Sequence, residues 1–100
     1  MKQYIITGYD HTDEGAIDRR MAVRPQHLEG AKELKANNNY IMGGAILDDE
    51  GKMIGSVMVL QFETEEELEA WKKREIYITA GVWETVEVKP FRVVYSTQVN

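Results

Sequence analysis

The sequence predicts a single α+β domain in which two helices cover one face of an antiparallel sheet. Two observations lead to this fold class. Four segments rich in β-branched and aromatic residues alternate with two segments of helical character. Their order along the chain is β-α-β-β-α-β, which is the split βαβ, ferredoxin-like arrangement.

The predicted strands are short apolar runs bounded by polar or turn-forming residues. Residues 53–62 carry mostly apolar side chains on both faces, which predicts a central strand covered on both sides. The turn at residues 48–52 contains Gly51 and predicts a hairpin. We expect strands at residues 3–9, 40–47, 53–62 and 83–95, with Pro90 marking a bulge or a sheet edge in the last one.

Residues 13–37 form the first predicted helix, which an asparagine run ends because asparagine tolerates the left-handed conformation of many helix ends. Apolar side chains recur in this segment at three- and four-residue steps, as on the core face of a helix. The residues of this predicted core face are Ile17, Met21, Leu28, Ala31 and Leu34.

The second predicted helix begins at a capping box, in which Thr64 and Glu67 satisfy each other's backbone N–H groups. Leu68 and Trp71 then face inward. A short helical turn within residues 74–80 follows, and Gly81 closes it.

Pro25 interrupts the helical pattern of the first helix. Proline has no N–H, and its ring crowds the carbonyl of Met21, so we predict that the helix breaks there. Arg20, Arg24 and His27 fall at positions i, i+4 and i+7, on one stripe beside the apolar one. Two cations and an imidazole next to a helix break indicate a candidate site.

Length and composition exclude several classes of protein. One hundred residues fit one domain, at residues 1–100, and the net charge of -5 argues against binding to nucleic acid or to an anionic membrane. The chain has no cysteine and no apolar run of the ~20 residues that a membrane-spanning helix needs. We therefore expect a cytoplasmic protein without a cofactor. Asp10, His11 and Asp13 are residue types that can bind a metal, but the two histidines of the chain lie sixteen residues apart, so we expect no metal site.

His27 is the candidate general acid or base, because an imidazole exchanges protons near neutral pH. Asp10, at the end of the first predicted strand, could accept a hydrogen bond from its ring and fix the tautomer. The alternatives are a helix histidine without a catalytic role and an aspartate that caps the following helix.

Arg20 and Arg24 are candidates for binding a substrate carboxylate or enolate, which a guanidinium can hold through two hydrogen bonds. The alternative for both arginines, favoured for Arg20, is an ion pair with one of the carboxylates of Asp10, Asp13 and Glu75. Ser56 could donate to a ligand, or could simply be tolerated at the start of a strand. Gly43 and Gly44 allow another backbone or a ligand to approach closely, although they also suit packing alone.

Several motifs, taken together and in order, resemble the YCII-related (YciI-like) family of small dimeric α+β barrel proteins. The resemblance spans nearly the whole chain and rests on these segments: the strand ending in Asp10, Arg20 with Arg24-Pro25-x-His27-Leu28, Gly43-Gly44, Gly55-Ser56, the Trp71 helix, Tyr77-x-x-Ala80-Gly81-Val82 and Val86 to Phe91. It implies a ferredoxin-like fold, a homodimer and a site with a His-Asp pair, at positions that match His27 and Asp10.

One segment departs from the family pattern. Where the family has Asp-Pro followed by an aromatic residue, this chain has Glu75-Ile76-Tyr77. The carboxylate at Glu75 is one methylene longer, and the proline is absent. We count Glu75 as a third candidate catalytic residue, whose geometry can differ from that of its family counterpart.

The predicted fold leaves one face of the sheet without helices. Because the strand at residues 53–62 is apolar on both faces, this open face needs a cover. A second copy of the chain, packed sheet to sheet, is the simplest one. We therefore expect a homodimer through the sheet face.

Three functions fit these residues. The first is a small cofactor-independent enzyme, an isomerase or lyase, in which His27 moves a proton on a small cyclic or carbonyl-containing acid and Arg24 stabilises the negative charge. The second is a non-catalytic protein that binds or senses a small anionic molecule in the same cleft. The third is a structural protein whose purpose is the dimer face.

The site hypothesis makes a geometric prediction, that His27 lies within hydrogen-bond reach of Asp10 or, failing that, of Glu75. At ~1.5 Å of rise per residue, a straight helix would carry His27 away from Asp10. Contact with Asp10 therefore needs the break at Pro25, a long loop after Asp10, or the other subunit.

Overall fold

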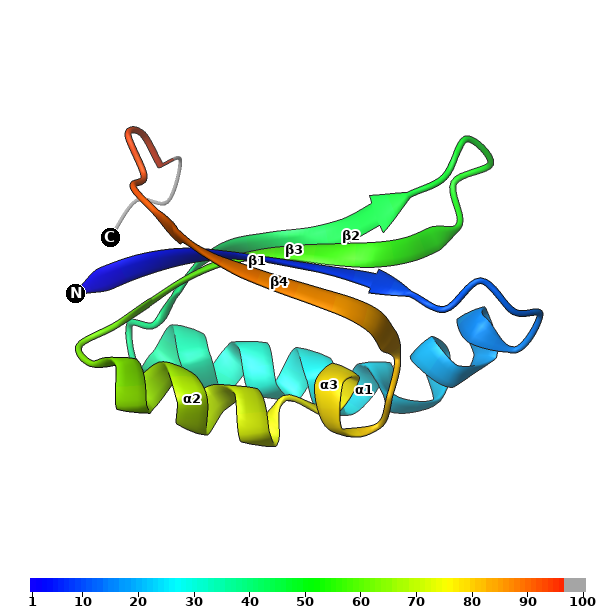
Figure 1. The fold of residues 1–100 in the computed structure, drawn as a ribbon, viewed down its shortest axis with the longest axis horizontal. Coiled ribbons are helices and arrows are strands. Elements are labelled where there is room, and N and C mark those ends of the chain that lie inside the picture. Colours follow the sequence, from blue (N-terminus) through cyan, green and yellow to red (C-terminus); the bar gives the residue numbers. More distant parts are fainter. Residues whose placement is uncertain (97–100) are drawn as a thin grey trace.

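The computed structural model describes residues 1–96. Its elements follow one another in the predicted order, and the short helical turn expected within residues 74–80 is present before the last strand (Figure 1). They are β1 (Lys2–Asp10), α1 (Ala16–Ala36), β2 (Tyr40–Leu47), β3 (Met53–Phe62), α2 (Glu65–Arg74), α3 (Ile76–Thr79) and β4 (Trp83–Phe91).

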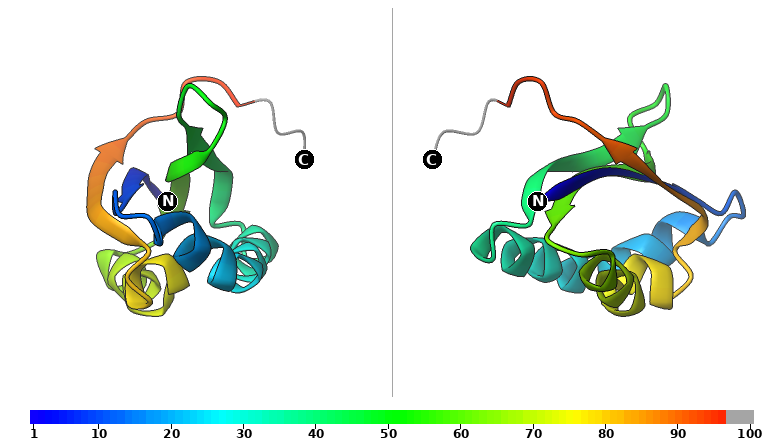
Figure 2. Two further views of the ribbon diagram at one scale, coloured as in Figure 1. Left: turned by 90° about the vertical axis from the view of Figure 1, so that its right-hand side faces the viewer. Right: turned by 60° about the vertical axis from the view of Figure 1, so that its left-hand side comes forward.

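The four strands form one sheet in the order β2-β3-β1-β4, and each neighbouring pair is antiparallel. All three helices lie against the same face of this sheet, and the other face carries no helix (Figure 1, Figure 2). The predicted ferredoxin-like fold is confirmed. β3 lies between β2 and β1, as its two apolar faces predicted.

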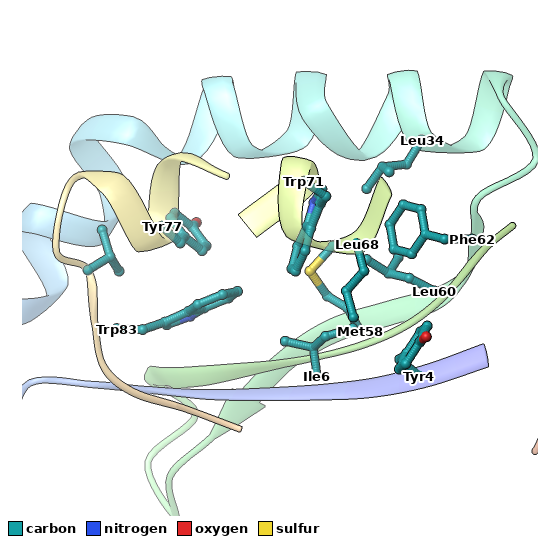
Figure 3. Packing of buried hydrophobic residues seen from close by; sticks show 11 residues of the cluster. Tyr4, Ile6, Leu34, Met58, Leu60, Phe62, Leu68, Trp71, Tyr77 and Trp83 are labelled. Atoms are coloured by element: carbon teal, nitrogen blue, oxygen red, sulfur yellow. The ribbon is translucent and has the colours of Figure 1, made fainter. Parts of the chain in front are cut away.

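The hydrophobic core lies between the sheet and the helices (Figure 3). Trp71 and Leu68 of α2 pack against Phe62 and Met58 of β3 and Ile6 of β1, all of them buried. α2 begins at the predicted cap, where the Thr64 hydroxyl oxygen accepts a hydrogen bond from the backbone N–H of Glu67 at 3.3 Å. Burial of these large side chains is the main term that holds the helices on the sheet.

α1 is one continuous helix through Pro25, so the predicted break at this residue is wrong. Proline removes one backbone hydrogen bond of the helix, and the packing of both flanking segments on the sheet offsets this loss. The predicted end of the helix is confirmed. Asn38 adopts the left-handed conformation, with φ of 61°, and the N–H of Asn39 donates to the carbonyl of Leu34 at 2.8 Å.

The predicted core face of α1 is mostly wrong. Of its five residues only Leu34 is buried, whereas Ile17, Met21 and Leu28 are exposed. The helix instead turns Arg20 towards the sheet, where its side chain is 2% exposed. A buried guanidinium needs polar partners, and the partners present on β1 and β3 stabilise this rotation of the helix.

β4 is an edge strand, as Pro90 predicted, but it ends at Phe91 and does not continue to Tyr95. Phe91 pairs with Gln3, close to the start of β1, so little partner backbone remains for a longer strand. The N–H of Val93 donates to the side-chain oxygen of Gln3 instead, at 2.9 Å. Across residues 1–96, no helix has the length and apolar character needed to cross a membrane.

Candidate active site

Glu75 lies at the junction of α2 and α3 and connects this junction to α1. Its extended backbone conformation, with φ of -67° and ψ of 118°, ends one helix and starts the next. One carboxylate oxygen, Oε2, accepts the backbone N–H of Tyr77 at 2.9 Å and thereby caps α3. The same oxygen lies 3.0 Å from Nδ1 of His27, and both side chains are largely buried.

The imidazole of His27 is held at its edge and on its face. Glu75 holds the Nδ1 edge, while the ring stacks on Tyr77 with centroids 3.9 Å apart and planes 7° from parallel. An ionised carboxylate can only accept hydrogen bonds, so this contact with an ionised Glu75 requires the proton on Nδ1. In the neutral ring, Nε2 is then the unprotonated nitrogen and can act as a base.

Asp10 does not contact His27. It is the partner of Arg20, whose Nη1 donates to both carboxylate oxygens, at 2.9 and 3.2 Å. Nη2 of Arg20 donates to the hydroxyl oxygen of Ser56 at 2.8 Å, and Asp10, Arg20 and Ser56 are all buried. The alternative of an internal ion pair for Arg20 is therefore confirmed. His27 pairs with Glu75, which was the second of its two predicted partners.

A cavity of about 210 Å³ lies between α1 and the strands β2 and β3. Its wall holds three of the predicted cationic or titratable side chains, together with both glycines of β2, and it contains no carboxylate. The lining residues are Arg20, Arg24, His27, Leu28, Ala31, Tyr40, Gly43, Gly44, Ala45, Ser56, Met58 and Tyr77. The wall is thus positively charged although the chain as a whole is negatively charged.

Arg24 is the cation of this wall that the protein leaves free. Its side chain is half-buried, and it forms no hydrogen bond or ion pair with any other residue of the part that the structure describes. Arg20, by contrast, uses both of its terminal nitrogens on Asp10 and Ser56. Arg24 therefore provides the charge with which the cavity can attract an anion.

The two glycines of β2 have different roles. A Cβ atom on Gly43 would lie 2.5 Å from the hydroxyl of Tyr40, so this glycine makes room for a cavity-lining ring. A Cβ atom on Gly44 would meet no atom within 4 Å. Packing thus accounts for Gly43, while Gly44 borders the cavity through its backbone alone, since it pairs with Val57 on the open face of the sheet.

Sequence reasoning did not select Tyr77 as a functional residue. It is fully buried, it lines the cavity, and besides His27 it contacts the guanidinium of Arg20, whose Cζ lies 4.8 Å from its ring centroid. Burial raises the pKa of the Tyr77 phenol, against the opposing effect of Arg20. The signal that could have found it was its place two residues after Glu75.

The other acidic and histidine residues near the start of α1 are separate from this site. His11 lies 3.4 Å from Glu84, and the exposed Asp13 forms a two-point contact with Arg19 that lowers the pKa of the aspartate. Residues 1–96 contain no group of three histidine or acidic side chains placed to hold a metal ion.

The sequence matches the profile of the YCII-related domain over residues 2–92. The chain belongs to the YCII-related domain family. This YCII-related chain is 35% identical over 98 residues to an uncharacterised protein of Haemophilus influenzae. It is 33% identical over 98 residues to Protein YciI of Escherichia coli. Each alignment covers 92% of this chain and 98% of the relative.

Solved structures share the fold of this YCII-related domain at lower sequence identity. A 5-chloro-2-hydroxyhydroquinone dehydrochlorinase from Burkholderia phenoliruptrix, in complex with 2,5-dihydroxybenzoquinone, superimposes with a TM-score of 0.77 at 22% identity, over 90% of this chain and 93% of that one. A dimeric ferredoxin-like protein from an uncultured marine organism gives a TM-score of 0.58 at 14% identity, over 96% and 98% of the two chains.

Proposed function

We propose that this protein is a small cofactor-independent enzyme that moves a proton on a small anionic substrate. One observation carries the proposal. His27, held through Nδ1 by Glu75, borders a cavity whose wall contains the unpaired Arg24 and no carboxylate. A base and an uncompensated cation at one cavity are the two groups that proton abstraction next to a carbonyl needs.

In this proposal Nε2 of His27 is the base. Glu75 does not line the cavity whereas His27 does, so we place the free nitrogen of the ring on the cavity side. Glu75 would stabilise the imidazolium that forms, as a carboxylate does for a catalytic histidine. A ring that is already held at its edge and its face loses little freedom when the substrate binds, which favours the reaction.

Arg24 would bind the anionic group of the substrate and stabilise the negative charge that develops on it. Ser56 accepts a hydrogen bond from Arg20, so its own hydroxyl proton is free to be donated to a ligand. Arg20 and Asp10 form an ion pair with each other. They would position Ser56 and have no direct part in the chemistry. Isomerisation and elimination both fit this arrangement.

The size of the cavity supports a small substrate. A volume of about 210 Å³ is below the ~300 Å³ at which pockets for drug-sized ligands begin. The dehydrochlorinase that shares this fold acts on a chlorinated hydroxyhydroquinone, a compound with a single ring. We therefore propose a short or single-ring substrate with an anionic oxygen and a removable proton.

Binding and turnover measurements on two variants test the proposal. His27→Gln should abolish turnover of a candidate substrate while keeping its affinity within a fewfold, because the base is lost and the cation remains. Arg24→Gln should weaken binding of the planar anion 2,5-dihydroxybenzoquinone. If His27→Gln loses affinity as strongly as Arg24→Gln and no candidate substrate turns over, the protein is a non-catalytic binding protein instead.

We also propose that two copies of the chain associate through the open face of the sheet. Met42, Val59 and Ile5 lie in register across β2, β3 and β1 on this face, and Met42 is 59% exposed. The ferredoxin-like neighbour from a marine organism is itself dimeric, which supports an association of two copies. Light scattering should give twice the 11.5 kDa of one chain at micromolar concentration, and a monomer would refute the proposal.

A further inference from the structure

The hydroxyl of Tyr77 is a buried donor for which the protein supplies no acceptor. Three buried side-chain atoms of residues 1–96 have no hydrogen-bond partner, and they are Nε of Arg20, the hydroxyl of Tyr77 and Nε1 of Trp83. Trp83 is not part of the cavity wall, and Arg20 is already held by two other contacts. Tyr77 alone lines the cavity while making no hydrogen bond through its side chain.

A buried hydroxyl without a partner is unfavourable for folding, because the hydrogen bond it made to water in the unfolded chain is not replaced. Phenylalanine would fill the same space without this loss. The hydroxyl of Tyr77 is therefore not needed for folding, which indicates that it forms a hydrogen bond with a bound molecule.

The position of Tyr77 places its hydroxyl next to the proposed base. Its ring lies parallel to the imidazole of His27, with centroids 3.9 Å apart. The indole of Trp83 packs edge-on against the Tyr77 ring, with centroids 5.6 Å apart. The hydroxyl oxygen of Tyr77 lies on the side away from this indole (Figure 3). Because burial raises its pKa, the phenol keeps its proton at neutral pH and can donate it in a hydrogen bond.

We propose that the Tyr77 hydroxyl donates a hydrogen bond to the substrate oxygen that becomes negatively charged when His27 removes a proton. This inference rests on the proposed function. In the step, the C–H bond next to a carbonyl breaks and its proton moves to Nε2 of His27. The electron pair moves onto the carbonyl oxygen, which becomes an enolate oxygen. Tyr77 holds this oxygen, while Arg24 holds the anionic group with which the substrate arrived.

This assignment narrows the substrate class. The ligand needs an anionic group for Arg24, a carbonyl oxygen for Tyr77 and a removable proton between them for His27. Carbonyl-containing acids with a C–H bond next to the carbonyl satisfy all three requirements, whereas 2,5-dihydroxybenzoquinone offers the anionic group and the carbonyl oxygen and therefore serves as a binding probe. A saturated carboxylate has no separate carbonyl oxygen for Tyr77 and meets only the requirement for an anionic group. Its affinity should therefore not depend on Tyr77.

The test compares Tyr77→Phe with Tyr4→Phe, a control at a buried tyrosine outside the cavity. Calorimetric titration with 2,5-dihydroxybenzoquinone should give an affinity about 10- to 100-fold weaker for Tyr77→Phe, as expected for loss of a hydrogen bond to a charged oxygen. Propionate, a saturated carboxylate, should bind equally to Tyr77→Phe and wild type. Thermal unfolding of Tyr77→Phe should occur at or above the wild-type temperature, since the variant removes an unpaired hydroxyl.

Two results would overturn the assignment and leave the proposed function standing. In the first, Tyr77→Phe folds normally and binds 2,5-dihydroxybenzoquinone as tightly as wild type, while Arg24→Gln does not. In the second, Tyr77→Phe unfolds at a clearly lower temperature with unchanged affinity, which would give the hydroxyl a structural role. Failure of wild type to bind either anion would overturn both this assignment and the proposed function.

Discussion

Nδ1 of His27 lies 3.0 Å from Oε2 of Glu75, an oxygen that also accepts the backbone N–H of Tyr77. A single carboxylate therefore fixes the start of α3 and the orientation of the imidazole on α1. Since Tyr77 in turn stacks on this imidazole, residues 75–77 hold His27 from two directions. The geometry of the proposed base depends on this short turn more than on α1 itself.

Asp10 should be needed for stability. Asp10→Ala leaves the buried guanidinium of Arg20 without its counter-charge, and breaking a buried ion pair in this way costs roughly 3–5 kcal/mol. Urea unfolding measures this loss. Asp13→Ala is the matched control, because it breaks the contact to the neighbouring Arg19 at an exposed site, where solvent screens the charges. Equal stabilities of the two variants would contradict the structural role of Asp10.

Gly8 should tolerate no side chain. A Cβ atom there would lie 2.3 Å from the indole of Trp83, which packs on Tyr77. Gly8→Ala should therefore destabilise the fold by about 1–3 kcal/mol. By moving Trp83 it should also displace the ring of Tyr77, which stacks on His27. Gly30→Ala, at a glycine inside α1 with open space around it, should leave the midpoint of denaturant unfolding unchanged or raise it. A Gly8→Ala protein as stable as wild type would show that the indole can move.

Alkaline pH should destabilise the fold partly through Tyr77. Burial raises its pKa in the folded state, so between the unfolded value of about 10 and the folded value the unfolded chain loses a proton that the folded chain keeps. The free energy of unfolding therefore falls as pH rises above about 10 and is unaffected by this group at lower pH. Urea unfolding from pH 8 to 11 should show a smaller fall for Tyr77→Phe. Tyr40, whose pKa burial also raises, accounts for part of the remaining fall.

A charge on the open face of the sheet should separate the proposed dimer. Val57 pairs with Thr7 and Gly44 in a row across this face, and Val57→Glu would place a carboxylate in the interface. Analytical ultracentrifugation should then report a monomer. Met21→Glu adds the same charge at an exposed residue of α1, on the helical side, and should leave the dimer intact. Dimers of both variants, or monomers of both, would argue against the sheet face.

Local patterns in the sequence predicted the elements well. The ranges expected for β2 and β3 agree with the structure, and Thr64 and Asn38 act where the capping patterns placed them. These features depend on residues close together in the chain, so a linear sequence contains the information. The break at Pro25 was wrong because tertiary packing of the flanking turns outweighs the loss of one backbone bond.

The candidate site was predicted only in part, because its contacts are long-range. The sequence selected His27, Arg24 and Glu75, yet the partner of Arg20 on β3, Ser56, lies 36 residues away and Glu75 lies 48 residues from His27. No local sequence pattern indicates that α1 turns Arg20 towards the sheet and leaves Ile17, Met21 and Leu28 exposed. Tyr77 was missed for the same reason, since only the folded chain leaves its hydroxyl unpaired.

Nitrogen NMR of the His27 ring tests the central claim most directly. His11 is the other histidine of the chain, and a His11→Gln variant assigns the signals. When the His27 ring is neutral, we predict that Nδ1 carries the proton and Nε2 does not. Adding 2,5-dihydroxybenzoquinone should shift the Nε2 signal of His27 and leave the signals of His11 unchanged. A neutral ring protonated on Nε2, or a His27 signal that the anion leaves unchanged, would contradict the assignment of His27 as a base held by Glu75 at an anion-binding cavity.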